Sequence, residues 1–197
     1  MSKIFKLIAE ALPKDANTEI SMLFNMPDDM NGGIFLMHRV IGEHDDSIDI
    51  PEEYFNMLDI CDHAIDVHTH PNYNCIPSAM DIAFYLSNPE IREAYIVGKD
   101  AIAHIPFRYD REYIAPHTVE KVYNQIVQGI ADDYDNFVAS VTSKDTCDIS
   151  YLTSFTNVGQ DTIAEAMFTE ASLQLMEHFK LTDFALYDLP DYFKEQK

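Results

Sequence analysis

The stretch "DVHTHPNYNCIPSAMD", residues 66–81, predicts a strand that ends in two histidines, then a loop and a helix. Side chains two residues apart along a strand point to the same face of a sheet. The segment "HAIDVHTH" (63–70) alternates as a strand does, so His68 and His70 are expected to project together from its end. Two imidazoles placed in this way can bind one cation.

Asp81 completes a candidate ligand set with the two histidines. Zinc binds imidazole nitrogen at about 2.0–2.1 Å and carboxylate oxygen at about 2.0–2.2 Å, and a catalytic zinc usually keeps three protein ligands and one open position. The seven residues between His70 and Ser78 are long enough to bring the first turn of the helix at 78–87 back over the histidines. We therefore expect one Zn²⁺ per chain, held by His68, His70 and Asp81.

A second interpretation of the same residues needs no metal. Ser-x-x-Asp before an apolar run is typical of a capping box, with Ser78 as the N-cap and Asp81 at the third helical position. An acidic residue there also suits the helix dipole. Ser-x-x-Asp alone favours the cap, and a single His-x-His is weak evidence, but the two together with Pro71 form a more specific pattern.

The complete pattern, His-x-His-(x)7-Ser-x-x-Asp, resembles the JAMM signature of MPN-domain (JAB-type) zinc metalloproteases. The resemblance covers roughly residues 3–110. It implies an α/β fold of the MPN/JAMM, cytidine-deaminase-like kind: a mixed β-sheet flanked by helices. The implied activity is zinc-dependent hydrolysis of isopeptide or peptide bonds, deubiquitinase-like, often at the C-terminus of a ubiquitin-like protein.

The resemblance also implies two catalytic residues outside the ligand set. The family uses a glutamate at a strand start after the first helix, and Glu19 stands there, although the glycines that usually follow are missing from "ISMLFNM". Such a carboxylate acts as the general base towards water, and the Ser78 hydroxyl would stabilise the oxyanion. Three other glutamates remain open as the base: Glu43, and Glu52 and Glu53, whose place at a helix start is expected without function.

Periodicity along the chain predicts a helix over 3–12, a hairpin of strands at 19–26 and 34–42, and a helix with Pro51 at its first position. A strand (63–70), a helix (78–87) and two strands (93–98 and 101–107) follow. After Pro116 come an apolar helical stripe from Val119 to Ile130 and a second long helix over 162–180. We expect an α/β metalloprotease core over residues 1–116 and a helical C-terminal extension over 117–197, packed on the core.

Composition narrows the classes of partner that this chain is expected to bind. The formal net charge of −21 repels phosphates, so we expect neither nucleic acid nor an anionic membrane as a partner. An acidic surface suits a protein substrate with a basic tail, such as a ubiquitin-like protein, although it also simply favours solubility. A homodimer remains open. Three cysteines without a CxxC pair predict free thiols in the cytoplasm: Cys61, Cys75 and Cys147.

Other functions and other site residues compete with this reading. A non-catalytic MPN-type scaffold is one alternative. Another is a different metal-dependent amidohydrolase, because "DVHTHP" resembles the opening of amidohydrolase barrels, which need about 200–250 residues. Cys75 lies in the loop after the histidines, but it is not favoured as a metal ligand. His63 is expected on the opposite face of its strand, and His38 and His104 are expected to be packed or superficial.

Overall fold

The computed structural model of the chain describes residues 3–12, 18–27, 33–42, 48–71, 74–142, 160–181, 183–190 and 193. By their contacts, residues of the chain form two units. The first comprises Met1–Ile76, Asn88–Tyr113 and Leu181–Lys197, and it carries a β-sheet. The second comprises Pro77–Ser87 and Ile114–Lys180, and its described elements are helices. Within the described ranges, no helix combines the length and the apolar character needed to cross a membrane.

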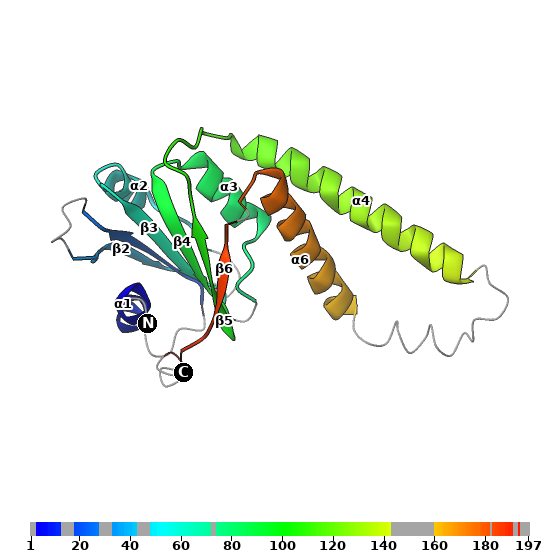
Figure 1. Cartoon of the computed structure of the whole chain (residues 1–197), viewed down its shortest axis with the longest axis horizontal. Helices are drawn as coiled ribbons and strands as arrows, with labels where there is room; N and C mark the ends of the chain where they lie inside the picture. The colour runs from blue at the N-terminus through cyan, green and yellow to red at the C-terminus, as the bar shows by residue number, and fades with distance from the viewer. Residues whose placement is uncertain are drawn as a thin grey trace. The chain divides into compact units, whose positions relative to one another are not determined.

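A single six-stranded mixed sheet organises the first unit (Figure 1). Its strands follow the order β2-β1-β3-β4-β5-β6, and of the strand pairs in the described residues only β3–β4 is parallel. The bounds are β1 Ile20–Asn25, β2 Phe35–Ile41, β3 Ala64–Thr69, β4 Ile91–Val97, β5 Ala101–Pro106 and β6 Ala185–Asp188. The expected hairpin of β1 and β2 is confirmed, as are an α/β class and a mixed sheet.

The two faces of this sheet differ in chemistry. On one face, alternate residues of β1 and β3 form an apolar core with α1 (Lys3–Ala11), whose Ile4, Phe5 and Ile8 are buried. Because neighbouring side chains of a strand point to opposite faces, Asp66 and His68 belong to the other face. The buried Tyr54 of α2 (Glu52–Leu58) reaches Asp66 there.

Two local features differ from expectation. Pro51 occupies the N-cap of α2, with φ −76° and ψ 162°, one position before the first helical residue where it was expected. Strand β6 lies in a segment where the sequence pattern identified helices only, and it pairs with β5 in antiparallel register.

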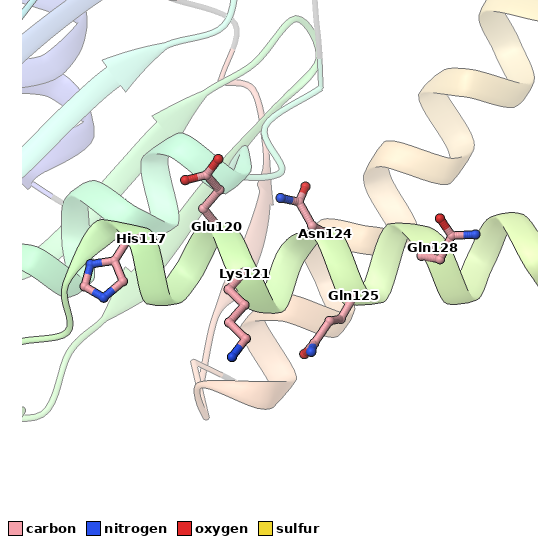
Figure 2. Close-up of a pocket in the computed structure, with 6 residues that line it drawn as sticks. All are labelled: His117, Glu120, Lys121, Asn124, Gln125 and Gln128. Carbon is pink, nitrogen blue, oxygen red and sulfur yellow. The ribbon is translucent and has the colours of Figure 1, made fainter.

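The second unit consists of α3 (Ala79–Ser87), α4 (Pro116–Thr142) and α6 (Gln160–His178). Helices α4 and α6 pack against each other, and both contact α3 (Figure 1). Val119 of the predicted stripe is buried and the rest of that stripe is half-buried. The other side of α4 is polar, and six of its residues line a shallow hollow (Figure 2): His117, Glu120, Lys121, Asn124, Gln125 and Gln128. No other element lines that hollow among the described residues.

Candidate metal centre

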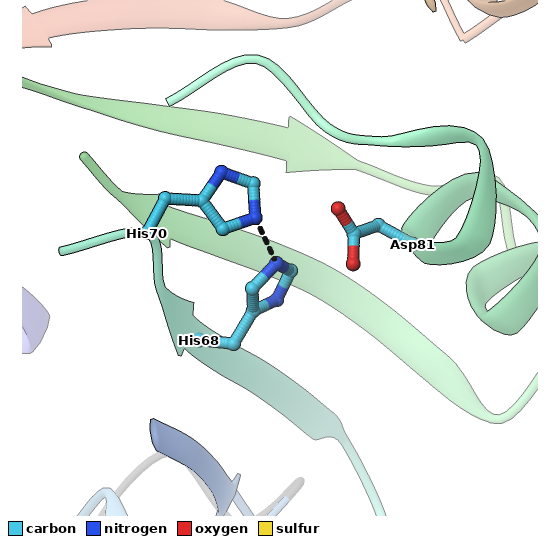
Figure 3. A group of neighbouring side chains, drawn as sticks. All are labelled: His68, His70 and Asp81. Atoms are coloured by element: carbon cyan, nitrogen blue, oxygen red, sulfur yellow. Dashed lines mark hydrogen bonds between the residues drawn. The ribbon is translucent and has the colours of Figure 1, made fainter. Parts of the chain in front are cut away.

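Two buried imidazoles meet at the end of β3. His68 is the fifth residue of that strand and His70 follows its last residue, so both lie on one face. They are 6% and 7% exposed, and their Nε2 atoms are 3.1 Å apart (Figure 3). The backbone N–H of His70 also donates to the carbonyl of Val97 in β4, at 2.9 Å, which continues the parallel pairing past the strand end.

The second nitrogen of each ring faces an acceptor. The Nδ1 atom of His68 lies 3.4 Å from Oδ2 of Asp66, and Nδ1 of His70 lies 3.0 Å from the carbonyl oxygen of Asn74. Because carbonyl and carboxylate oxygens only accept hydrogen bonds, these contacts favour the tautomer with the hydrogen on Nδ1 in each ring. Both Nε2 atoms then present lone pairs towards each other.

This arrangement fits a bound cation. Two nitrogen lone pairs facing at 3.1 Å repel each other unless a positive charge is shared between them. Two ligands at about 2.0–2.1 Å from a tetrahedral zinc lie about 3.3 Å apart, close to the spacing of these nitrogens. Metal-binding histidines in proteins usually donate their other ring N–H to an acceptor, and the Nδ1 atoms of both histidines face acceptors here.

Asp66 is anchored from behind the site. Its Oδ1 accepts hydrogen bonds from the hydroxyls of Tyr54 and Ser21, and all three side chains are at most 2% exposed. Burial, and next the charge of Asp66, raise the pKa of Tyr54 well above its ordinary value, so the phenol remains a donor. Helix α2 and strand β1 therefore hold the carboxylate beside His68.

The loop after His70 depends on a glycine. A Cβ atom built on Gly98 would lie 2.5 Å from the backbone nitrogen of Cys75 and 2.8 Å from the carbonyl carbon of Asn74. Side chains do not make contacts this short, so only glycine allows the loop to approach the end of β4 so closely. The same loop supplies the Asn74 carbonyl that orients His70.

The capping box predicted at the start of α3 is present in the second unit. The backbone N–H of Ser78 donates to Oδ2 of Asp81 at 2.6 Å, and the N–H of Asp81 donates to Oγ of Ser78 at 3.1 Å. Both residues therefore have a structural role whether or not a metal binds. The cap uses Oδ2, and a carboxylate has two oxygens, so this role and metal ligation are compatible.

His68, His70 and Asp81 form a group that could hold a metal ion, with one ligand atom from each lying within 4.8 Å of the others (Figure 3). No other such group of three or more His, Cys, Asp or Glu side chains occurs among the described residues, and Cys75 is not a member. The histidines belong to the first unit and Asp81 to the second. The paired nitrogens are therefore fixed by one unit alone.

Glu19 lies directly before β1 and is half-buried. Its carbonyl accepts from the N–H of Gly42, and the next N–H, that of Ile20, donates to Oγ1 of Thr69 at 3.0 Å. Ser21 pairs with His68 in the antiparallel register. Glu19 therefore lies two residues before Ser21, at the end of β1 that pairs with His68.

The rival glutamates stand elsewhere. Glu52 and Glu53 are exposed in the first turn of α2. Glu43 lies outside the described residues, as does Cys147. Cys61 donates to the carbonyl of Met57, and burial raises the pKa of its thiol to about 11, which does not suit a nucleophile.

Three histidines considered as alternatives, His38, His63 and His104, have partners of their own. The His63 and His104 rings each bind one oxygen of Glu93, at 3.0 and 2.8 Å, and His38 packs beside the Tyr54 ring. The hydrogen bond from His104 is the main cause that lowers the pKa of Glu93 to about 2. Sequence reasoning missed Glu93 and Asp66, because their partners come from other strands or from α2.

The amidohydrolase-barrel alternative is wrong in its fold. That architecture needs eight parallel strands, whereas four of the five strand pairs described in this sheet are antiparallel. The comparisons with known proteins add no relative: no family model matches the chain, and neither a curated protein nor a solved structure shows significant similarity to it.

Proposed function

We propose that this protein is a zinc-dependent hydrolase of peptide or isopeptide bonds, with a JAMM-type site on an MPN-like sheet. The observation that carries the proposal is the pair of Nε2 atoms of His68 and His70, 3.1 Å apart with both Nδ1 atoms on acceptors. The motif spacing adds Asp81 as the third ligand of one zinc ion per chain.

Bound zinc would lower the pKa of a coordinated water towards about 7 and polarise a substrate carbonyl. Glu19, which directly precedes β1, would accept the proton of the attacking water and deliver it to the leaving amine. The Ser78 oxygen already accepts from the N–H of Asp81, so its own O–H is the group to donate to the oxyanion.

The charge of the chain points to the class of substrate. At −21, its field attracts positively charged segments and repels nucleic acid and anionic lipid. A ubiquitin-like protein with a basic C-terminal tail has the complementary charge, and the bond after such a tail is the one that a JAMM-type enzyme hydrolyses. We propose this class as the substrate.

Cleavage of a panel of ubiquitin-like fusions, with basic and with neutralised tails, tests the function. Zinc-loaded protein should cleave the basic-tailed members, a chelator should stop cleavage, and added zinc should restore it. His104→Ala removes a histidine outside the candidate site and serves as the matched control, with parental activity expected. Stoichiometric zinc without cleavage of any fusion would reject the hydrolase and leave a metal-binding scaffold.

A further inference from the structure

Asp66 is a buried carboxylate that the proposed reaction does not use. It is 1% exposed and lies two residues before His68 on the same face of β3. Burying a carboxylate is costly unless hydrogen bonds compensate for the lost water. Asp66 is therefore held in this strand by specific partners, and those partners show what it does.

The bonds of Asp66 form a directed chain. The Tyr54 and Ser21 hydroxyls donate to Oδ1, while Oδ2 faces Nδ1 of His68 at 3.4 Å. The two donors hold one oxygen and thereby aim the other at the ring. At 3.4 Å the bond to His68 is long, so its effect is mainly to choose which ring nitrogen carries the hydrogen.

The choice of nitrogen matters for binding a cation. A lone pair on Nδ1 of His68 would face the carboxylate oxygen and be repelled, so the hydrogen resides on Nδ1 and the lone pair on Nε2. That lone pair points towards His70 (Figure 3). A carboxylate behind a metal-binding histidine also raises the basicity of the ring, and removing such a partner typically costs about 10–100-fold in metal affinity.

We propose that Asp66, anchored by Tyr54, is a positioning residue that holds His68 in the Nδ1–H form and so prepares Nε2 for the metal. This inference rests on the proposed function for its zinc-binding consequence. Its structural part, the position of the hydrogen on His68, is independent of metal and of catalysis. All the residues that carry it belong to the first unit.

Zinc affinity, measured by competition with a chromophoric chelator, is the first test. Asp66→Asn should weaken binding by about 10–100-fold, because the amide can donate to Nδ1 and favour the wrong tautomer. Tyr54→Phe should weaken it by a smaller factor, since it frees the carboxylate to move. Tyr95→Phe is the matched control: Tyr95 also donates to a carboxylate, Glu93, at 2.9 Å, but on the other face of the sheet, so affinity should be unchanged.

Nitrogen-15 spectra of the imidazoles in the metal-free protein are the second test. The parent should show a protonated Nδ1 on His68, and Asp66→Asn should shift the hydrogen towards Nε2, with far-ultraviolet circular dichroism preserved. The parent spectrum decides the matter even where the Asn variant fails to fold.

The outcomes separate the two proposals. An unprotonated Nδ1 in the parent, or parental zinc affinity in a folded Asp66→Asn variant, would overturn the role of Asp66. A parent that shows the expected tautomer but binds no zinc would overturn the proposed function and leave the positioning of His68 standing.

Discussion

Two clusters on opposite faces of the sheet contain the same residue types, histidine and carboxylate, in different arrangements. In one, a carboxylate stands behind a histidine at Nδ1, and the Nε2 atoms of His68 and His70 face each other. In the other, Glu93 stands between His63 and His104, and each Nε2 atom already binds one of its oxygens. The first arrangement directs two nitrogens at one point, whereas in the second both nitrogens are already hydrogen-bonded to a carboxylate.

The difference teaches that the position of the carboxylate, and not the presence of two histidines, distinguishes a candidate metal site from a cluster of internal hydrogen bonds. Tyr95 adds a further donor to Glu93 and stacks on the His104 ring, with ring centroids 4.4 Å apart. The Glu93 cluster therefore stabilises the packing of β4 against β5.

Removing one histidine from each cluster should give the largest contrast. His68→Ala should abolish stoichiometric zinc binding, because it removes one of the three proposed ligands. His104→Ala should keep about one zinc per chain. Elemental analysis of the dialysed proteins measures both, and equal zinc in the two variants would erase the distinction between the clusters.

Glu19→Gln separates the proposed general base from the proposed zinc ligands. The amide keeps the size of the side chain but cannot accept the proton of water, so turnover should fall by about 10²–10⁴-fold while zinc content stays parental. Glu52→Gln, in the exposed first turn of α2, is the control and should retain full turnover. Parental cleavage by Glu19→Gln would make Glu19 a bystander and Glu43 the next candidate.

Ser78→Ala should act on both rate and stability. Loss of the proposed oxyanion donor should lower turnover by about 10²–10³-fold. Loss of the cap to the N–H of Asp81 should cost about 1 kcal/mol of folding free energy. Zinc content should not change. Urea unfolding, measured first, shows whether the variant is folded under the assay conditions, and a folded variant with parental turnover would restrict Ser78 to its capping role.

Gly98→Ala tests the loop that supports His70. The added Cβ would meet backbone atoms at 2.5 and 2.8 Å, so the loop must move. We expect a loss of about 1–3 kcal/mol in unfolding free energy and weaker zinc binding through the displaced Asn74 carbonyl. Gly129→Ala is the control: its Cβ meets nothing within 4 Å in α4, so stability should rise by about 1 kcal/mol.

The Glu93 cluster should make the stability of the folded protein depend on pH. Its folded-state pKa of about 2 lies below the ordinary 4.5, chiefly through the bond from His104. The contribution of ionised Glu93 to the free energy of unfolding is therefore complete above pH 4.5, and it is lost as the pH falls towards about 2. Because solvent screens these partly exposed groups, we expect this contribution to be on the order of 1 kcal/mol. The urea midpoint of the parent should fall more steeply over this range than that of Glu93→Gln; parallel profiles would contradict the ion cluster.

The sequence alone determined the order of elements up to β5 and the candidate ligands. These features depend on neighbours within a few residues: the alternation in 63–70, the helical period after Pro116, and the cap made by Ser78 and Asp81. Such patterns are local, and the structure reproduces most of them to within two residues.

Only the tertiary structure decided which side chains surround the histidines. The partner of His68 within β3, Asp66, owes its orientation to Tyr54 on α2, 12 residues away. The need for glycine at 98 arises from the backbone of Asn74 and Cys75. Strand β6 has four residues with little burial and joins the sheet through β5, more than 80 positions earlier in the chain. Each depends on contacts between distant segments, which no local periodicity records.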